Sequence, residues 1–584
     1  MEDNLPDRKP LDRIRELQTQ RAEIMALPPE EALERILSHP QPAALVHSFP
    51  ESDFYLLVHE IGPEDALPVL ALASDRQWDH LVDLEGWARD RMEVTGVTRW
   101  MNLLMEAEPR RFLRWFTNER SGFGELYLFH TVEMRMLEHD QDPSEFGEGF
   151  FTFDGVYYLR LLKLPPGPAE SAMGEEERNA FLMKLLERLA NHDHAHFQNI
   201  VTASSHVIPA ESEEEEYRWR TVRLAEKGLV PFDEAVGIYQ PATPETLARR
   251  APHGRPSGAD RPAAALPVPA YPLRELPGDT LFGRALALVE SPAARPGLQL
   301  EFANLCNRII VADHRTIRDR EQLRPVVAKA CGYLSLGLEQ LKDRGEEAID
   351  PARAAAHLLR HPLADLFRLG FGTALKLKWD AERWLAGSWF GRAGLRLTFW
   401  GEQWMGVLGG VLLKKPLFYD NYRTGVLYRE FASPGDLAQT ERVLREVQAV
   451  DRLLALLGPQ ISPSGRPAGL TWKSLLLTRW ARHRLGLDAQ ELQPLALQAF
   501  RPFFDRLFGG AGAAAGSRKI PDAVKADFLA WLSAETGLEE HDLSESYGGI
   551  LEALFRELEV EYGRVDANDL DPRFVQLFLL KAAP

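Results

Sequence analysis

The stretch "SFPESDFYLLVHEIGPEDALPVLALASDRQWDHLVDLEGWARDR", residues 48–91, indicates how this chain folds. It divides into three successive helical segments. Pro50 begins the first helix and Gly62 ends it. Pro63 begins the second helix and Ser74 caps the third. Proline and acidic residues are favoured in the first turn of a helix and glycine just after its last turn, so this punctuation predicts short helices joined by short turns.

The same pattern continues outside this stretch. The segment "LPPEEALERILSHP" (residues 27–40) again places prolines and then glutamates at its start. Trp78, Leu81 and Val82 recur with the 3.6-residue period of an amphipathic helix. Helices of ~10–14 residues with short connections are typical of proteins in which helices stack on one another in a superhelix. We predict such an array of stacked short helices for residues 1–148.

A β-hairpin interrupts the helices in "GFFTFDGVYYLRLLKL", residues 149–164. Aromatic and β-branched residues favour strands, and Asp154-Gly155 between them suits a two-residue turn that needs positive φ. The aromatic side chains are expected to form the packing faces of this hairpin. We assign residues 149–240 to the hairpin and a helical extension.

The acidic run "ESEEEEYRWRTVRLAEKG", residues 211–228, is predicted to be a helix rather than a disordered tail. Its charges alternate by helical turn, so that Glu214 faces Arg218 and Glu216 faces Arg220. Such pairs at i,i+4 each contribute a few tenths of a kcal/mol, about 0.2–0.5, to an isolated helix.

A proline-rich segment, residues 241–278, separates two helical halves. It holds nine prolines and almost no periodic apolar pattern, which predicts a largely unstructured linker. After it, we predict a second helical domain over residues 279–458 and a C-terminal helical region over residues 459–584. The fold class is therefore mostly α.

The composition excludes several classes of protein. Hydrophobic residues make up 45% and charged residues 26% of the chain, and 86 acidic against 68 basic residues give a net charge of −18. This excess of negative charge argues against nucleic-acid binding, which needs basic surface. The most apolar segment, residues 404–413, is too short to span a bilayer, so we expect no membrane span.

The two cysteines and the N-terminal residues indicate a location. Cys306 and Cys331 are too few for a disulfide framework and suit a reducing compartment. The first residues are charged and lack the apolar core of a secretory signal. We expect a cytoplasmic protein.

Several fragments resemble an uncharacterised family of large bacterial proteins from sulfate- and metal-reducing lineages. They are "ALVHSFPESDFYLLVHEIGPEDALPVLALASDRQWDHLVDLEGWARDR", "FFTFDGVYYL", "EEEEYRWRTVRLAEKG", "EFANLCNRIIVAD", "GYLSLGLEQL" and "LLKKPLFYDNY". This resemblance spans nearly the whole chain and implies no activity and no catalytic residues. The first 120 residues more distantly resemble the N domain of MgtE-type magnesium transporters, which implies a helical superhelix and a response to Mg²⁺ through acidic residues.

The stretch "NHDHAHFQ", residues 191–198, is the candidate metal site. On a continuous helix His192 and His196 share a face at i,i+4, and His194 points away. Two neutral imidazoles can bind a divalent transition metal, but a catalytic zinc site needs a third protein ligand and an open position. The alternative is a set of surface or half-buried histidines.

A second histidine lies in "VADHRTIRDREQL", residues 311–323, where Asp313 precedes His314 and Asp319 follows. An aspartate can orient a histidine that acts as a base, although neighbours in sequence usually point apart. No phosphate-binding loop, dinucleotide fingerprint, nucleophile elbow or kinase signature is present in the sequence.

The densest feature is aromatic: "KWDAERWLAGSWFGRAGLRLTFWGEQW", residues 378–404. Tryptophan and arginine are enriched at binding hot spots, whereas a tryptophan-rich core between helices is the alternative. The candidate partner-binding residues are Trp379, Arg383, Trp384, Trp389, Trp400 and Trp404.

These features favour a non-enzymatic cytoplasmic scaffold or adaptor, without a cofactor, that binds a protein partner. The first alternative is a metal-dependent enzyme or metal sensor that uses His192, His194 and His196. The second is an Mg²⁺-responsive regulator that uses the acidic N-terminal helices.

Overall fold

The structure is a computed structural model that describes residues 8–163, 173–249, 269–291, 294–459, 469–488, 492–509 and 518–581. Helices dominate these residues, and the longest strands, β3 (Val132–Met136) and β5 (Tyr157–Leu161), have five residues each. The predicted mostly α fold class is confirmed. Among the described helices, none has both the length and the apolar composition that a bilayer crossing requires.

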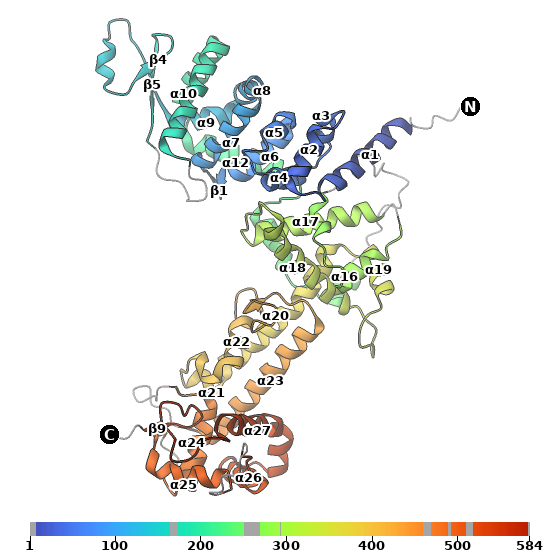
Figure 1. Cartoon of the computed structure of the whole chain (residues 1–584), viewed down its shortest axis with the longest axis vertical. Coiled ribbons are helices and arrows are strands. Elements are labelled where there is room, and N and C mark those ends of the chain that lie inside the picture. The colour runs from blue at the N-terminus through green and yellow to red at the C-terminus, as the bar shows by residue number, and fades with distance from the viewer. Residues whose placement is uncertain are drawn as a thin grey trace, which may run out of the picture. The chain divides into compact units, whose positions relative to one another are not determined.

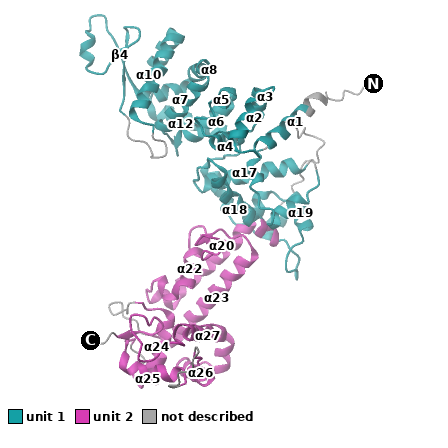
Figure 2. Ribbon diagram, viewed as in Figure 1, with its two compact units in different colours: residues 1–334, 341–368 teal, residues 335–340, 369–584 magenta. Residues whose placement is uncertain are grey.

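The chain forms two compact units (Figure 2). Unit 1 comprises residues 1–334 and 341–368, and unit 2 comprises residues 335–340 and 369–584. The main division therefore lies within the segment 279–458 that the sequence analysis assigned to one domain.

Unit 1 begins with a series of short helices (Figure 1). They are α1 (Arg8–Ile24), α2 (Pro29–Leu37), α3 (Pro42–His47), α4 (Glu51–Ile61), α5 (Leu67–Leu72), α6 (Asp75–Glu85), α7 (Val94–Ala107), α8 (Pro109–Arg114) and α9 (Ser121–Thr131). A two-stranded ladder, β1 (Trp87–Ala88) with β2 (Arg91–Met92), connects α6 to α7.

These helices stack as the sequence predicts. α4 packs against α2 and α6, and α5 packs against α3 and α7. Each helix thus contacts the helix two positions along the chain, which is the arrangement of stacked helical pairs. The indoles of Trp78, Trp100 and Trp115 are fully buried between them. A capping box of Ser74 and Gln77 begins α6 at the predicted residue.

The second helix of the opening stretch starts later than predicted. Residues 63–66 form a turn, and α5 begins at Leu67 rather than at Pro63. The reason is Pro68, which has no N–H to donate to a preceding turn and is therefore accommodated only in the first turn of a helix.

The predicted hairpin is present and belongs to a three-stranded antiparallel sheet in the order β3-β5-β4, with β4 at Phe151–Thr152. Thr152 pairs with Tyr158, so the connection is longer than the predicted two-residue turn. Asp154 determines this loop, because its carboxylate accepts hydrogen bonds from the backbone N–H groups of Val156 and Tyr157, both at 2.9 Å.

The remaining helices of unit 1 follow the sheet. They are α10 (Glu175–His192), α11 (His194–Ser205), α12 (Pro209–Ala225), α13 (Phe232–Ala235), α14 (Pro244–Arg249), α15 (Tyr271–Arg274), α16 (Leu281–Ala287), α17 (Ala294–Ala312), α18 (Arg320–Glu339), α19 (Pro351–Arg360) and the start of α20 (Leu363–Gly387).

The predicted linker is partly ordered. Residues 250–268 lie outside the described residues, but α14 and α15 occupy the ends of the 241–278 segment. Tyr271 is fully buried, and the buried Asp53 carboxylate accepts the N–H groups of Ala270, at 2.9 Å, and of Tyr271, at 3.3 Å. The expectation of a largely unstructured segment is therefore wrong at this end, because a buried carboxylate and an aromatic anchor hold it.

Unit 2 is organised around α23, which packs against α21, α22, α26 and α27. Its helices are the rest of α20, from residue 369, then α21 (Trp389–Arg392), α22 (Gly401–Val411), α23 (Pro434–Leu457), α24 (Trp472–Arg484), α25 (Leu497–Leu507), α26 (Asp522–Thr536) and α27 (Glu540–Tyr562). An antiparallel hairpin joins β6 (Phe418–Tyr419) to β7 (Tyr428–Arg429), and β8 (Leu495–Ala496) pairs in parallel with β9 (Leu580–Lys581). The core includes Trp480, whose ring meets Phe503 and Phe528 edge-on.

Candidate functional site

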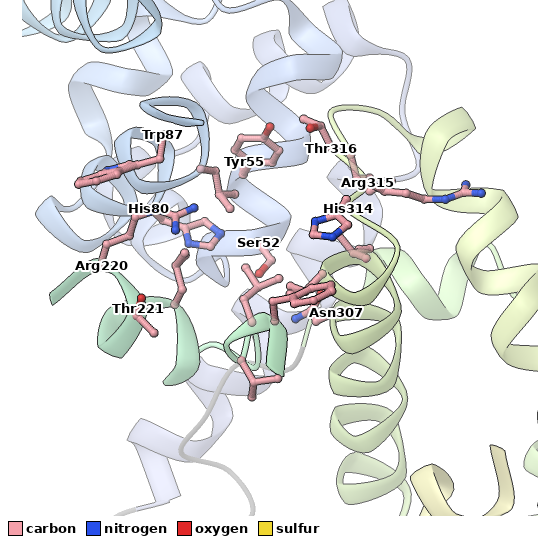
Figure 3. Close-up of a pocket in the computed structure, with 18 of the residues that line it drawn as sticks. Ser52, Tyr55, His80, Trp87, Arg220, Thr221, Asn307, His314, Arg315 and Thr316 are labelled. Atoms are coloured by element: carbon pink, nitrogen blue, oxygen red, sulfur yellow. The ribbon is translucent and has the colours of Figure 1, made fainter. Parts of the chain in front are cut away.

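A cavity of about 600 Å³ lies within unit 1 (Figure 3). α4 and α6 form one part of its wall, α12 a second, and α17 with the segment that follows it a third. The lining is completed by Trp87, Ala88, Arg89, residues 229–232, Leu323 and the prolines at 269 and 272. Small-molecule sites commonly enclose ~300–1,000 Å³, so the cavity is large enough for a ligand.

His80, on α6, is the most unusual group of this cavity. The residue is 1% exposed, and neither ring nitrogen forms a hydrogen bond with any described residue. Burial, with the nearby charge of Lys227, lowers the pKa of His80 to about 3, so the ring is neutral. A neutral imidazole offers one donor and one acceptor, and a buried polar group left unpartnered costs about 1–3 kcal/mol. Figure 3 shows the ring directed toward the cavity, near Ser52.

Arg220, on α12, lies next to His80 (Figure 3). Its Nε donates to the backbone carbonyl of Asp83 at 2.6 Å, and its guanidinium lies 5.7 Å from the ring centre of Trp87. Within the described ranges, no carboxylate lies at ion-pair distance from this guanidinium. Burial lowers the pKa of Arg220 from its ordinary value, although the arginine stays charged at neutral pH.

The position of Arg220 corrects one prediction from the acidic run. Arg218 pairs with Glu214 at 3.3 Å as predicted. The predicted pair of Glu216 with Arg220 is wrong, because Arg220 turns toward Asp83 on α6 and the charge of Glu216 instead faces Arg120 and Arg223.

Asp83, on α6, anchors α12 to the helical array. Its side chain is fully buried and accepts hydrogen bonds from Nε and Nη2 of Arg223, both at 2.8 Å, and from Arg120 at 3.2 Å. Burial works against ionisation, but the hydrogen bonds from Arg223 and the charge of Arg120 hold the pKa of Asp83 below its ordinary value. Asp83 is therefore a structural carboxylate that positions the wall carrying Arg220.

Asp53 and Glu85 are the other buried acids at this end of the unit. Burial raises the pKa of Asp53 to about 7. Burial also disfavours the charge on Glu85, but the His59 imidazole, 3.4 Å away, and hydrogen bonds from Arg318 and Tyr55 outweigh it and hold the pKa of Glu85 at about 2. Glu85, at the end of α6, thus joins this helix to α4 and, through Arg318, to the segment that precedes α18. Nε and Nη2 of Arg318 each lie 3.0 Å from a carboxylate oxygen of Glu85.

His314 lies on the side of the cavity opposite His80 (Figure 3). It has a left-handed backbone conformation, with φ of 51°, and its ring stacks on Phe232 at 4.4 Å. The preceding Asp313 faces elsewhere, because it accepts hydrogen bonds from Lys329 at 3.0 Å and from the Tyr239 hydroxyl at 2.7 Å. Asp313 therefore does not orient His314.

The sequence does not predict the cavity around His80, although it carries a signal for it. α6 buries Gln77, His80 and Asp83 along with its apolar residues. Polar side chains on the buried face of an amphipathic helix need partners, so they mark either a network or a site. Asp83 belongs to a network, and His80 belongs to the cavity.

The structure separates the three predicted metal ligands. α10 ends at His192, and Asp193 caps a new helix, α11, through the N–H of His196 at 3.0 Å, so the helix is not continuous as supposed. All three histidines are exposed; His196 lies 2.8 Å from Asp193, and His194 lies 3.6 Å from Asp154. In the described part of the chain, no three His, Cys, Asp or Glu side chains are grouped to hold a metal ion. The metal site stays a prediction.

The tryptophan-rich segment of unit 2 forms a cluster of packed rings. Trp400 is 1% exposed and lies 5.8 Å from the ring of Trp384 and 5.9 Å from that of Trp404. Asp451 of α23 accepts hydrogen bonds from Trp384 Nε1 and from the N–H of Trp389, both at 3.3 Å.

Two of the six predicted partner-binding residues lie on the surface. On α20, Trp379 is 45% exposed and the Arg383 side chain is 76% exposed. Arg383 pairs with Asp380 at 2.5 Å. Of the predicted set, these two are the most accessible to a partner.

The loop of the β6–β7 hairpin, residues 420–427, presents a further exposed aromatic side chain. Tyr422 is 64% exposed, and both Asn421 and Tyr422 have positive φ, 50° and 61°. Tyrosine rarely adopts this conformation, which costs roughly 1–2 kcal/mol for a residue with a Cβ. We call residues 420–427 the Tyr422 loop.

Comparisons with known proteins give a family and no activity. A family model described as "Family of unknown function (DUF6178)" matches residues 9–581. No curated protein and no solved structure shows a significant match to the chain.

Proposed function

The chain belongs to the family of unknown function DUF6178, and on this premise we propose that it is a non-enzymatic cytoplasmic adaptor that binds a protein partner through the Tyr422 loop. The observation that carries the proposal is Tyr422 itself: an exposed aromatic residue held in a backbone conformation that tyrosine avoids. Such strain persists only where the surrounding structure imposes it, and it concentrates at functional sites.

A network of hydrogen bonds imposes this conformation. The Asp420 carboxylate accepts the N–H of Thr424 at 2.7 Å and Nε of Arg429 at 2.9 Å. Nη1 of Arg429 also donates a hydrogen bond of 2.7 Å to the carboxylate of Asp436, at the start of α23. A loop ordered in advance loses little conformational entropy when it binds, so more of its contact energy contributes to affinity.

The surroundings of Tyr422 suit a protein surface. Within the same loop, Val426 and Leu427 are exposed by 45% and 37%. Arg423, also in the loop, is exposed and adds positive charge. Tyrosine and arginine are enriched at binding hot spots, so the partner is expected to present an apolar pocket for Tyr422 with an acidic rim.

A photo-crosslinking experiment tests the adaptor role. p-Benzoylphenylalanine replaces Tyr422 in the full chain in its native cells, and a matched chain carries the same group at Phe574, which is 75% exposed in unit 2 outside the loop. We expect one discrete crosslinked protein from position 422 and none from position 574. The same set of products from both positions would contradict the proposal.

The captured partner then allows a quantitative test. Tyr422→Ala is expected to raise the Kd about thirtyfold or more, as for a hot-spot residue worth ~2 kcal/mol or more, whereas Phe574→Ala leaves it unchanged. An unchanged Kd for Tyr422→Ala would remove the loop from the interface. The thermal stability of both variants, measured in parallel, separates lost binding from lost folding.

A further inference from the structure

The cavity of unit 1 has the features of a built ligand site, independent of the Tyr422 loop. Its wall holds a buried imidazole whose two nitrogens have no partner among the described residues. Ser52, in the first turn of α4, lies between His80 and His314 in Figure 3. His80 contributes to the wall of this space of about 600 Å³, and its two nitrogens lie buried just beneath the wall surface.

The charges on the wall favour an anion. Arg220 has no carboxylate partner at ion-pair distance within the described ranges, and Arg89 also lines the cavity, whereas the guanidinium of Arg315 points away from it in Figure 3. Asp53 is the single acidic residue of the lining in the described part of the chain, and backbone N–H groups at Ala270 and Tyr271 already satisfy its carboxylate. The cavity therefore offers an unneutralised guanidinium beside a neutral imidazole.

The rest of the wall favours a flat apolar body. The rings of Tyr55, Trp87, Tyr217 and Phe232 line the cavity with several aliphatic side chains. Aromatic walls with a few convergent polar groups are typical of sites that bury a planar ligand and orient it by one polar end.

We propose that this cavity binds a small planar molecule that carries an anionic oxygen group, with Arg220 holding the anion and the His80 ring forming part of the wall beside it. A carboxylate and a phosphate share this chemistry. The guanidinium provides a planar fork of donors that matches either group.

Calorimetric titration of the full chain with three naphthalenes tests the proposal without any variant. 1-Naphthyl phosphate, 1-naphthoate and 1-naphthol share one ring system and differ in the group attached to it. We expect at least one of the two anions to bind at one molecule per chain and at least tenfold more tightly than naphthol; the tighter anion identifies the phosphate or the carboxylate as the natural group. Equal affinity of naphthol and both anions, or no saturable binding of either anion, would overturn the proposal.

Substitutions of residues on α12 test whether the compounds bind in the cavity. Arg220→Gln is expected to weaken the anion at least tenfold and to leave naphthol within twofold, whereas Arg218→Gln, an exposed arginine of the same helix, changes neither. Thr221→Trp, which fills the cavity, is expected to abolish binding of all three compounds. Unchanged binding in a folded Arg220→Gln or Thr221→Trp chain would overturn the assignment. If Arg220→Gln does not fold, Arg220→Lys, which keeps the charge and loses the fork, is expected to weaken the anion and not naphthol.

Discussion

Asp83 and Arg223 lie 2.8 Å apart, and their ion pair joins α6 of the helical array to α12. The Asp83 carboxylate is fully buried and also forms an ion pair with Arg120. Buried ion pairs are costly to break from one side, because the remaining charge stays without a partner in a medium of low dielectric.

We therefore expect Asp83→Asn to lower the free energy of unfolding of unit 1 by about 3–5 kcal/mol. Hydrogen exchange read by mass spectrometry measures this directly in peptides from α6 and α12. The control is Glu214→Gln, which breaks an exposed pair on α12 and should leave exchange unchanged. Similar protection in both variants would show that the Asp83 pair is not a structural link.

Because of the buried Asp53 carboxyl, we expect the folded chain to lose stability as the pH rises. Its pKa is about 7 in the folded chain against an ordinary value of 3.8, so between about pH 4 and pH 7 only the folded chain binds this proton. The free energy of unfolding then falls with rising pH, by up to ~1.4 kcal/mol per pH unit. Urea denaturation at pH 5 and pH 8 should show Asp53→Asn gaining stability relative to the wild type at the higher pH. The same difference in unfolding free energy between Asp53→Asn and the wild type at both pH values would refute the raised pKa of Asp53.

For His80 we expect the opposite pH dependence of folding stability. Its pKa is about 3 in the folded chain against an ordinary 6.5, so between these values the unfolded chain alone binds the proton and stability falls as the pH falls. His80→Phe removes this titration together with two unpartnered nitrogens. We expect the variant to gain stability relative to the wild type as the pH is lowered from 7 to 5, measured by thermal unfolding. A constant difference would mean that His80 is accessible to protons in the folded chain.

Two glycines of unit 2 predict opposite effects of the same substitution. A methyl group at Gly406 on α22 would lie 2.4 Å from the ring of Tyr419, whereas one at Gly548 on α27 meets nothing within 4 Å. Gly406→Ala should therefore destabilise unit 2 by roughly 1–3 kcal/mol through overpacking. Gly548→Ala should stabilise it by about 0.5–1 kcal/mol through helix propensity. Urea denaturation compares the two, and a loss in both would rule out this steric explanation.

The adaptor proposal also predicts the metal content of the chain. Untagged protein purified without chelators should carry no stoichiometric zinc, iron or nickel in elemental mass spectrometry. A metal present at one equivalent and lost on replacing His192, His194 and His196 by alanine would instead establish the metal-dependent alternative.

Local signals in the sequence predicted much of the fold. Ser74 caps α6 and Gly62 follows α4 because helix ends depend on backbone groups within one turn. The hairpin around Asp154 likewise depends on neighbours in sequence, although the carboxylate lengthened the turn. α5 moved to Leu67 because a single proline, Pro68, outweighed the pattern before it.

Contacts between distant residues decided the rest. The partner of Arg220 changed from Glu216 to the Asp83 carbonyl because α12 packs on α6, a contact that no local pattern contains. The order around Tyr271 has the same origin, since the carboxylate that holds it belongs to α4.

The short amphipathic helices, their stacking and the mostly α class thus follow from periodicity and helix punctuation, because both act over a few residues. The cavity belongs to the tertiary structure alone. His80, Arg220, Ser52 and His314 come from four separate segments, and no pattern in the sequence brings them together. Their polar atoms converge only when packing removes them from water, and burial is what turns an ordinary histidine into a neutral, unpartnered donor and acceptor.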